Sequence, residues 1–167
     1  IQVEKLYLAY HTPPLTHEDY PAMLLLQTVL TGSKSSRLDR SLVDTGISAS
    51  INAYDPSFKD PGLMIFVSHL QKAKKAAMAE QVILREIKTL IDKPISDEEL
   101  ARAKNRLQYV FYSSLQDNAS RAQFLGESET FLNGFENALT MRDRIQSLSS
   151  EDIKRVARNY LKPESRT

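Results

Sequence analysis

Three histidines are the residues of this chain with the best-known metal chemistry, and they lie at positions 11, 17 and 69. One helix face holds zinc through two histidines in patterns such as H-E-x-x-H or H-x-x-E-H. His11, His17 and His69 lack that spacing, and the chain has no cysteine to supply a thiolate. Glu18 and Asp19 follow His17, but neighbours on a helix diverge by roughly 100° and do not form a ligand set. We therefore expect this chain to bind no metal cofactor.

The stretch GSKSSR, residues 32–37, contains the residue types of a phosphate-binding loop. The Walker pattern G-x-x-x-x-G-K-[ST] lies between a strand and a helix. Here the first glycine is missing, and helical spacing precedes the stretch. The pattern G-x-S-x-G is also absent, so a hydrolase nucleophile elbow is unsupported. We interpret these serines as helix caps and turn residues.

The carboxylates at 97–99 and 151–152 lie where helices are expected to begin. Favourable interaction with the helix dipole explains them without catalysis. Tyr109, Phe111 and Tyr112 cluster on one predicted helix, where packing in a core or an interface is simpler than a ligand site. From the residues alone, no catalytic constellation is present.

The elements that must position these residues follow from hydrophobic spacing. Alternation predicts strands within 4–12, 47–55 and 62–70, the last two as antiparallel neighbours because turn residues separate them. Helical spacing predicts helices within 16–32, 35–46, 72–93, 96–118, 119–131, 135–146 and 149–161. This pattern indicates an α+β fold with a mainly antiparallel sheet and helices packed on one face.

Helix caps and buried stripes sharpen this prediction. Thr16 is the expected cap of the first helix, and Ser96 and Ser149 begin capping boxes with Glu99 and Asp152. The expected buried stripes are Ala79, Ile83, Ile87 and Leu90; Leu100, Ala103, Leu107, Phe111 and Ser114; and Ile153, Val156, Ala157 and Tyr160.

Composition excludes several classes of partner. The 167 residues carry 22 Lys and Arg against 21 Asp and Glu, a net charge of +1. Lys72, Lys74 and Lys75 precede Glu80 and Glu86, a pattern of a solvated helix face rather than of a nucleic-acid patch. No apolar run approaches the roughly 20 residues that span a bilayer. We expect no nucleic acid partner and no membrane span.

Five segments, taken in order, resemble one family nearly end to end. They are LYLAYHTPP, LLLQTVLTGSKSSRLDRSLVDTGISASINA, ISDEELARAKNRLQYVFYSSL, RAQFLGESE and LSSEDIKRVARNYLKPESRT. Together they resemble the pitrilysin/insulinase superfamily of zinc metallopeptidases. More narrowly, they are similar to the second, non-zinc domain of its mitochondrial-processing-peptidase-like members, which implies the LuxS/MPP-like metallopeptidase fold.

The resemblance implies a division of labour. Such enzymes are clamshells of homologous domains, one of which carries H-x-x-E-H and holds the zinc. No H-x-x-E-H occurs in this chain. We expect residues 1–167 to be a single domain of a larger peptidase, non-catalytic alone, packing against a zinc-bearing domain of the same chain or a paired subunit. Peptide substrate would enter the chamber that the two enclose. The sequence leaves the compartment open between periplasm and cytoplasm, and we favour the periplasm. An assembly module without proteolysis, as in respiratory-complex core subunits, is the alternative.

The family also has residues that assist from this side of the chamber. After G-x-S-S-R-L, a helix supplies an arginine, and a tyrosine follows seven residues later. In this chain Val43 and Ala49 fall near those positions, so we assign no catalytic residue. Arg37 and Arg40 lie close by and are the candidates for contact with substrate or with the partner domain.

Overall fold

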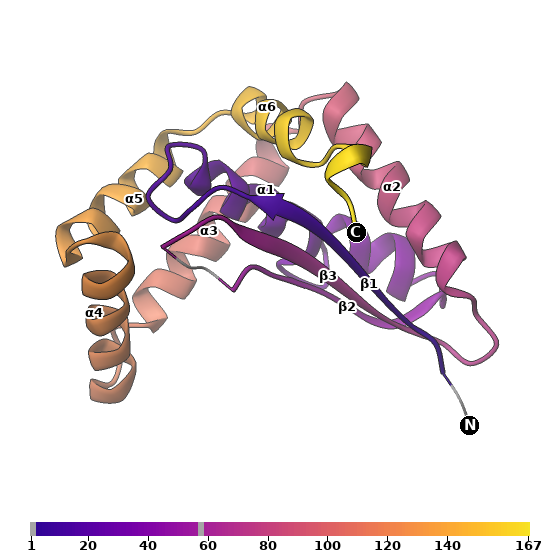
Figure 1. Ribbon diagram of the computed structural model, residues 1–167, viewed down its shortest axis with the longest axis horizontal. Coiled ribbons are helices and arrows are strands. Elements are labelled where there is room, and N and C mark those ends of the chain that lie inside the picture. Colours follow the sequence, from indigo (N-terminus) through magenta and orange to yellow (C-terminus); the bar gives the residue numbers. More distant parts are fainter. Residues whose placement is uncertain (1–2, 57–58) are drawn as a thin grey trace.

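The computed structural model describes residues 3–56 and 59–167, and it has the expected α+β fold (Figure 1). The strands are β1 (Lys5–Thr12), β2 (Ser48–Tyr54) and β3 (Gly62–Leu70). The helices are α1 (Tyr20–Thr31), α2 (Ala76–Asp92), α3 (Asp97–Ser113), α4 (Asn118–Leu132), α5 (Phe135–Ser147) and α6 (Ser150–Tyr160). Two short turns complete the chain, the π-helical η1 (Asp39–Val43) and the 3-10 η2 (Pro163–Ser165).

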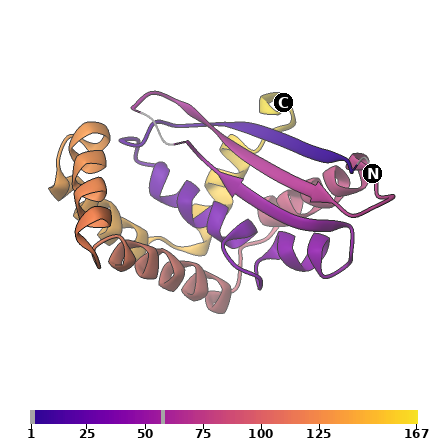
Figure 2. The same cartoon turned by 90° about the horizontal axis from the view of Figure 1, so that it is seen from below.

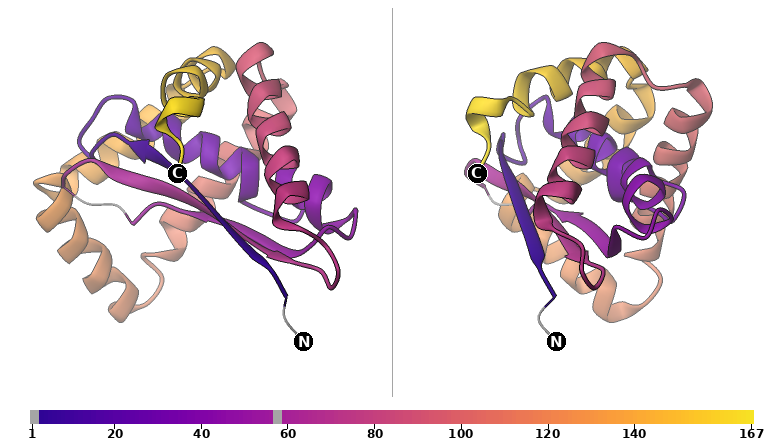
Figure 3. Two further views of the ribbon diagram at one scale, coloured as in Figure 1. Left: turned by 45° about the vertical axis from the view of Figure 1, so that its right-hand side comes forward. Right: turned by 90° about the vertical axis from the view of Figure 1, so that its right-hand side faces the viewer.

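The three strands form one antiparallel sheet in the order β1-β3-β2. The prediction that β2 and β3 are antiparallel neighbours is confirmed. Side chains alternate strictly along β1 and β3, so that Leu8, Tyr10, Met64 and Phe66 are buried on one face. The helices pack on that face, as the view from below and the turned views show (Figures 2 and 3).

The core lies between this sheet face and the helices. On α1, Leu25, Leu26 and Leu30 are fully buried, since this helix is apolar nearly all round. The stripe predicted for α2 is buried as expected. On α6 the stripe is also buried except for Tyr160, which is half-buried at its C-terminal end.

Three helices begin later than predicted, and the one expected within 35–46 is only the short η1, Asp39–Val43. The first helix begins at Tyr20, so Thr16 is not its cap. Pro21 has no backbone N–H to donate and is tolerated only in a first turn, which excludes a start at residue 16. The helix predicted within 72–93 is α2, which begins at Ala76, because the Glu4 carboxylate accepts from the Ala76 N–H at 2.8 Å.

The predicted capping boxes differ in outcome. Ser149 and Asp152 form the complete reciprocal box at the start of α6. At α3, Ser96 accepts from the Glu99 N–H, but the Glu99 carboxylate binds Arg37 in place of Ser96. A tertiary ion pair therefore replaces half of that box.

Helices α4 and α5 form the end of the molecule that lies away from the N-terminus (Figures 1 and 2). The break between them is at Asn133 and Gly134, as predicted, and both have positive φ. Only Ala103 of the stripe predicted for α3 is fully buried. Phe111 is half-buried, because its ring packs edge-to-face on Phe124 of α4 and lies against Arg142 of α5 rather than in the core. No helix in the described part of the chain has the length and apolarity to cross a bilayer.

Candidate functional site

One face of the sheet is left uncovered by the helices, and we call it the open face. It follows from the register, because residues directly opposite one another in an antiparallel pair share a face. Tyr7 lies opposite Val67, which lies opposite Asn52 on the other side, and Ile65 lies opposite Tyr54. The open face consists of Lys5, Tyr7, Ala9, His11, Ser50, Asn52, Tyr54, Leu63, Ile65, Val67 and His69.

The middle of the open face is aromatic and aliphatic. Tyr7 is 58% exposed, Tyr54 46% and Leu63 37%, and Ile65 and Val67 between them are half-buried. Lys5 and His69 are register partners at one end of the face, and His11 lies at the other. No carboxylate belongs to this described surface. It is equipped to contact apolar side chains, and it has no carboxylate base to activate water.

The histidines do not fit a zinc ion. His11 lies opposite Leu63, six residues along β3 from His69, which separates the two histidines by about 20 Å. Zinc–nitrogen bonds are about 2 Å long. His17 lies in the turn before α1, where its Nδ1 accepts from the Asp19 N–H at 3.1 Å. Within residues 3–56 and 59–167, no three His, Cys, Asp or Glu side chains are grouped to hold a metal.

The structure distinguishes the two candidate arginines. The Arg37 guanidinium donates to both carboxylate oxygens of Glu99, at 2.7 and 2.8 Å. The two side chains are 20% and 18% exposed, and the hydrogen bond to Glu99 raises the pKa of Arg37. Arg40 is exposed, and it forms no ion pair in the described part of the chain. Contact of either residue with substrate stays a prediction, for which Arg40 is the more available.

Val43 and Ala49 occupy the two positions where the resemblance would place an arginine and a tyrosine. Val43 ends η1 and is half-buried. Ala49 lies at the irregularity of β2 between Ser48 and Ser50, and it is exposed. Neither side chain can donate a hydrogen bond to a substrate carbonyl, so these positions carry no catalytic group.

A polar cluster that the sequence analysis missed joins the start of α1 to α6. The Asp19 carboxylate is 8% exposed; it accepts from Arg155 Nη1 at 2.6 Å and from the Tyr160 hydroxyl at 2.9 Å. Burial first, and then this hydrogen bond, raise the pKa of Tyr160 to about 12. Both oxygens of Asp19 are therefore engaged in holding two helices together. Asp19 and Tyr160 are 141 residues apart in the chain, a distance at which no local pattern signals the contact.

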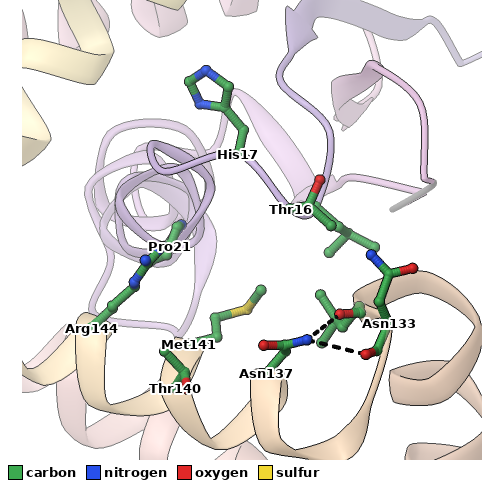
Figure 4. A pocket seen from close by; sticks show the side chains of 10 residues that line it. Thr16, His17, Pro21, Asn133, Asn137, Thr140, Met141 and Arg144 are labelled. Atoms are coloured by element: carbon green, nitrogen blue, oxygen red, sulfur yellow. Dashed lines mark hydrogen bonds between the residues drawn. The ribbon is translucent and has the colours of Figure 1, made fainter.

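A cavity of about 240 Å³ lies between the turn before α1 and the junction of α4 and α5 (Figure 4). The Asn137 amide donates to the carbonyls of Leu132 and Asn133, which ends α4. The His17 ring turns away from these asparagines in Figure 4. Asn137 thus serves the helix junction, and no nucleophile–base pair is assembled among the described residues that line this cavity.

Known proteins resemble this chain in sequence and in fold. An uncharacterized zinc protease of Streptomyces coelicolor is 27% identical over 147 residues, 87% of this chain. An inactive peptidase domain from Bordetella parapertussis is 27% identical with a TM-score of 0.87, covering 100% of this chain and 89% of that one. A chain in complex III2 from Candida albicans, 18% identical over 98% of this chain and 42% of its own, has the same fold at a TM-score of 0.83.

The chain spans only 32% and 38% of the length of the two curated relatives that it matches. The family model described as the peptidase M16 inactive domain matches residues 1–107, from β1 into α3. This is more than half of the chain, and it includes the whole sheet and η1. The chain belongs to the peptidase M16 inactive-domain family.

Proposed function

We propose that this chain is the non-catalytic domain of a zinc metalloendopeptidase, and that its open face forms part of the wall of the substrate chamber. In this proposal residues 1–167 are one domain of a larger protein or complex. A homologous domain, in the same chain or in a paired subunit, holds the zinc and activates the water.

The single observation that carries the proposal is the uncovered face of the sheet. In a helix-and-sheet fold the second sheet face is normally solvated and polar, or covered by another layer. Here Tyr7, Tyr54 and Leu63 are exposed on it, and apolar neighbours lie between them. Contiguous exposed apolar surface marks a contact site for protein or peptide. Because the chain spans about a third of its curated relatives, the remaining length can supply the opposite wall.

The test compares turnover of an unstructured, quenched-fluorescence peptide by three preparations. These are this chain alone, the intact parent, and the parent with the glutamate of its zinc motif replaced. We expect turnover only by the intact parent, and we expect a chelator to abolish it. Chelator-sensitive turnover by this chain alone, at a rate near that of the parent, would overturn the proposal.

A matched pair of variants in the parent tests the part played by the open face. Tyr7→Ser removes an exposed tyrosine from the face, and Tyr109→Ser removes an equally exposed one, 61% exposed, from α3. We expect Tyr7→Ser to raise KM about threefold with kcat unchanged, since wall contacts bind substrate and transition state alike. Equal kinetics of the two variants would contradict a wall at the open face.

The alternative is an assembly module without proteolytic activity. The fold likeness to a chain of complex III2 favours it, because that fold is also present in a respiratory assembly. A parent without H-x-x-E-H, or one that carries the motif but cleaves no unstructured peptide, would favour this alternative.

A further inference from the structure

The lysines that the sequence places on a helix lie instead in a loop at one end of the sheet. Residues 71–75 join β3 to α2, and Ala73 takes a left-handed φ of 65° there. The loop is tied to the segment before β1, because Glu4 accepts from Lys75 Nζ at 2.9 Å and from the Ala76 N–H. Lys72 and Lys74 form no ion pair in the described residues.

This loop adds charge to an end of the open face that is already basic. Lys5 follows Glu4 directly and lies opposite His69, the last outward-facing residue of β3. The nearest acid, Glu4, is paired with Lys75. We call Lys5, His69, Lys72 and Lys74 the basic end. At the opposite end His11 and Leu63 adjoin a turn in which the exposed Lys59 and Asp60 carry opposite charges, so the net positive charge is concentrated at the basic end.

We propose that the open face binds an extended acidic and aromatic polypeptide segment, with its carboxylates at the basic end and its apolar side chains over Tyr7, Val67, Ile65 and Tyr54. The inference rests on the proposed function and gives it a substrate class. Complementary charge favours acidic residues and opposes basic ones at this end. Exposed tyrosines and branched side chains supply the apolar contact area for the rest of the segment.

A nucleic acid fits the same surface less well. Its phosphates repeat along the whole strand and require cations along the whole path. The two central rows of the open face, Tyr7–Val67–Asn52 and Ala9–Ile65–Tyr54, contain no cation. Three lysines, Lys5, Lys72 and Lys74, gather at one end of the face, which suits a segment that is acidic at one end and apolar in the middle.

The absence of cysteine allows a site-specific test on this chain, which covers 89% of a Bordetella relative whose structure is that of an isolated domain. The thiol of Asn52→Cys carries an attached photo-cross-linking reagent on the open face, and the thiol of Lys93→Cys carries the same reagent after α2. The probes are three unstructured 12-residue peptides, one acidic with aromatic residues, one basic with the same aromatics and one acidic with serines instead. A single-stranded oligonucleotide of equal charge is the fourth probe.

We expect the acidic aromatic peptide to cross-link at position 52 and not at 93, and to bind about tenfold more tightly than the other three probes. Lys5→Glu should weaken its binding about fivefold and improve binding of the basic peptide, because charge reversal replaces attraction by repulsion. Lys93→Glu, the same change on the helical side, should alter neither. Circular dichroism of each variant establishes that it is folded.

Three results would overturn the inference in distinguishable ways. Equal binding of the acidic and basic aromatic peptides at position 52 would remove the charge preference and leave the proposed function standing. If no peptide cross-linked more strongly at position 52 than at position 93, this result would contradict the proposed function itself. If the oligonucleotide bound more tightly than the acidic aromatic peptide, the ligand of the open face would be a nucleic acid and not a polypeptide.

Discussion

Replacing Arg37 by alanine should destabilise the fold, whereas the same change at Arg40 should not. Arg37 lies two residues before η1 and holds this segment to the first turn of α3 through two hydrogen bonds to Glu99, across 62 residues of chain. Arg40 lies on the same short segment, and its side chain is exposed. The sequence offers both arginines as candidates for substrate contact, but only Arg37 forms an ion pair that stabilises the fold.

The magnitude follows from the burial of the pair. An exposed ion pair contributes about 1 kcal/mol or less, and loss of one partner from a fully buried pair costs about 3–5 kcal/mol. Here the two side chains are 20% and 18% exposed, which lies between these limits. Hydrogen bonds to charged groups contribute about 1.5–3 kcal/mol. We expect Arg37→Ala to lower the free energy of unfolding by about 2 kcal/mol.

Urea unfolding followed by circular dichroism measures this difference. Arg37→Ala should lower the midpoint with an unchanged slope, since the surface exposed on unfolding stays the same. A double-mutant cycle with Glu99→Ala should give a coupling energy of about 1–2 kcal/mol. Arg40→Ala should stay within about 0.5 kcal/mol of the wild type.

Two results would refute this reasoning. If Arg37→Ala and Arg40→Ala were equally stable, the Glu99 pair would contribute nothing in solution. If the cycle gave no coupling, the loss on Arg37→Ala would come from packing of its alkyl chain rather than from the ion pair.

Three further outcomes are expected. Ile153→Ala should cost about 2–5 kcal/mol, since Ile153 is fully buried, and Ser149→Ala about 1 kcal/mol, while exposed Asn159→Ala changes denaturant stability little; an unchanged midpoint for Ile153→Ala would show that this stripe is not buried. Tyr160 should ionise only near pH 12 in ultraviolet difference spectra. Its raised pKa means that the stability from its bond to Asp19 is full below about pH 10 and lost as pH rises toward 12; a wild-type and Tyr160→Phe difference constant to pH 12 would contradict this. Elemental analysis after dialysis against dilute zinc should find no stoichiometric zinc, and one zinc lost on replacing any histidine would refute the argument from spacing.

Local patterns carried the prediction of elements, because their causes lie within a few residues. Alternation in GLMIFVSHL and the turn residues before it predict β3 and its antiparallel pairing with β2, as found. The reciprocal box of Ser149 and Asp152 begins α6 as predicted, since both hydrogen bonds close within one turn. Where a tertiary contact competed, the local prediction was wrong. The Glu4 carboxylate accepts from the Ala76 N–H, where α2 begins, and the Glu99 carboxylate binds Arg37 in place of the Ser96 N–H.

The sequence by itself determined the α+β class, the family resemblance and the dispersal of the histidines, because periodicity and spacing are properties of the chain. Only the tertiary structure decided that Tyr7, Val67 and Asn52 form one row of an uncovered face, since strand order and register depend on pairing between distant segments. It also decided that Arg37 is paired with Glu99 and that Arg40 is exposed. The attraction between two charged side chains depends on their distance in space, and that distance cannot be read from their separation along the chain.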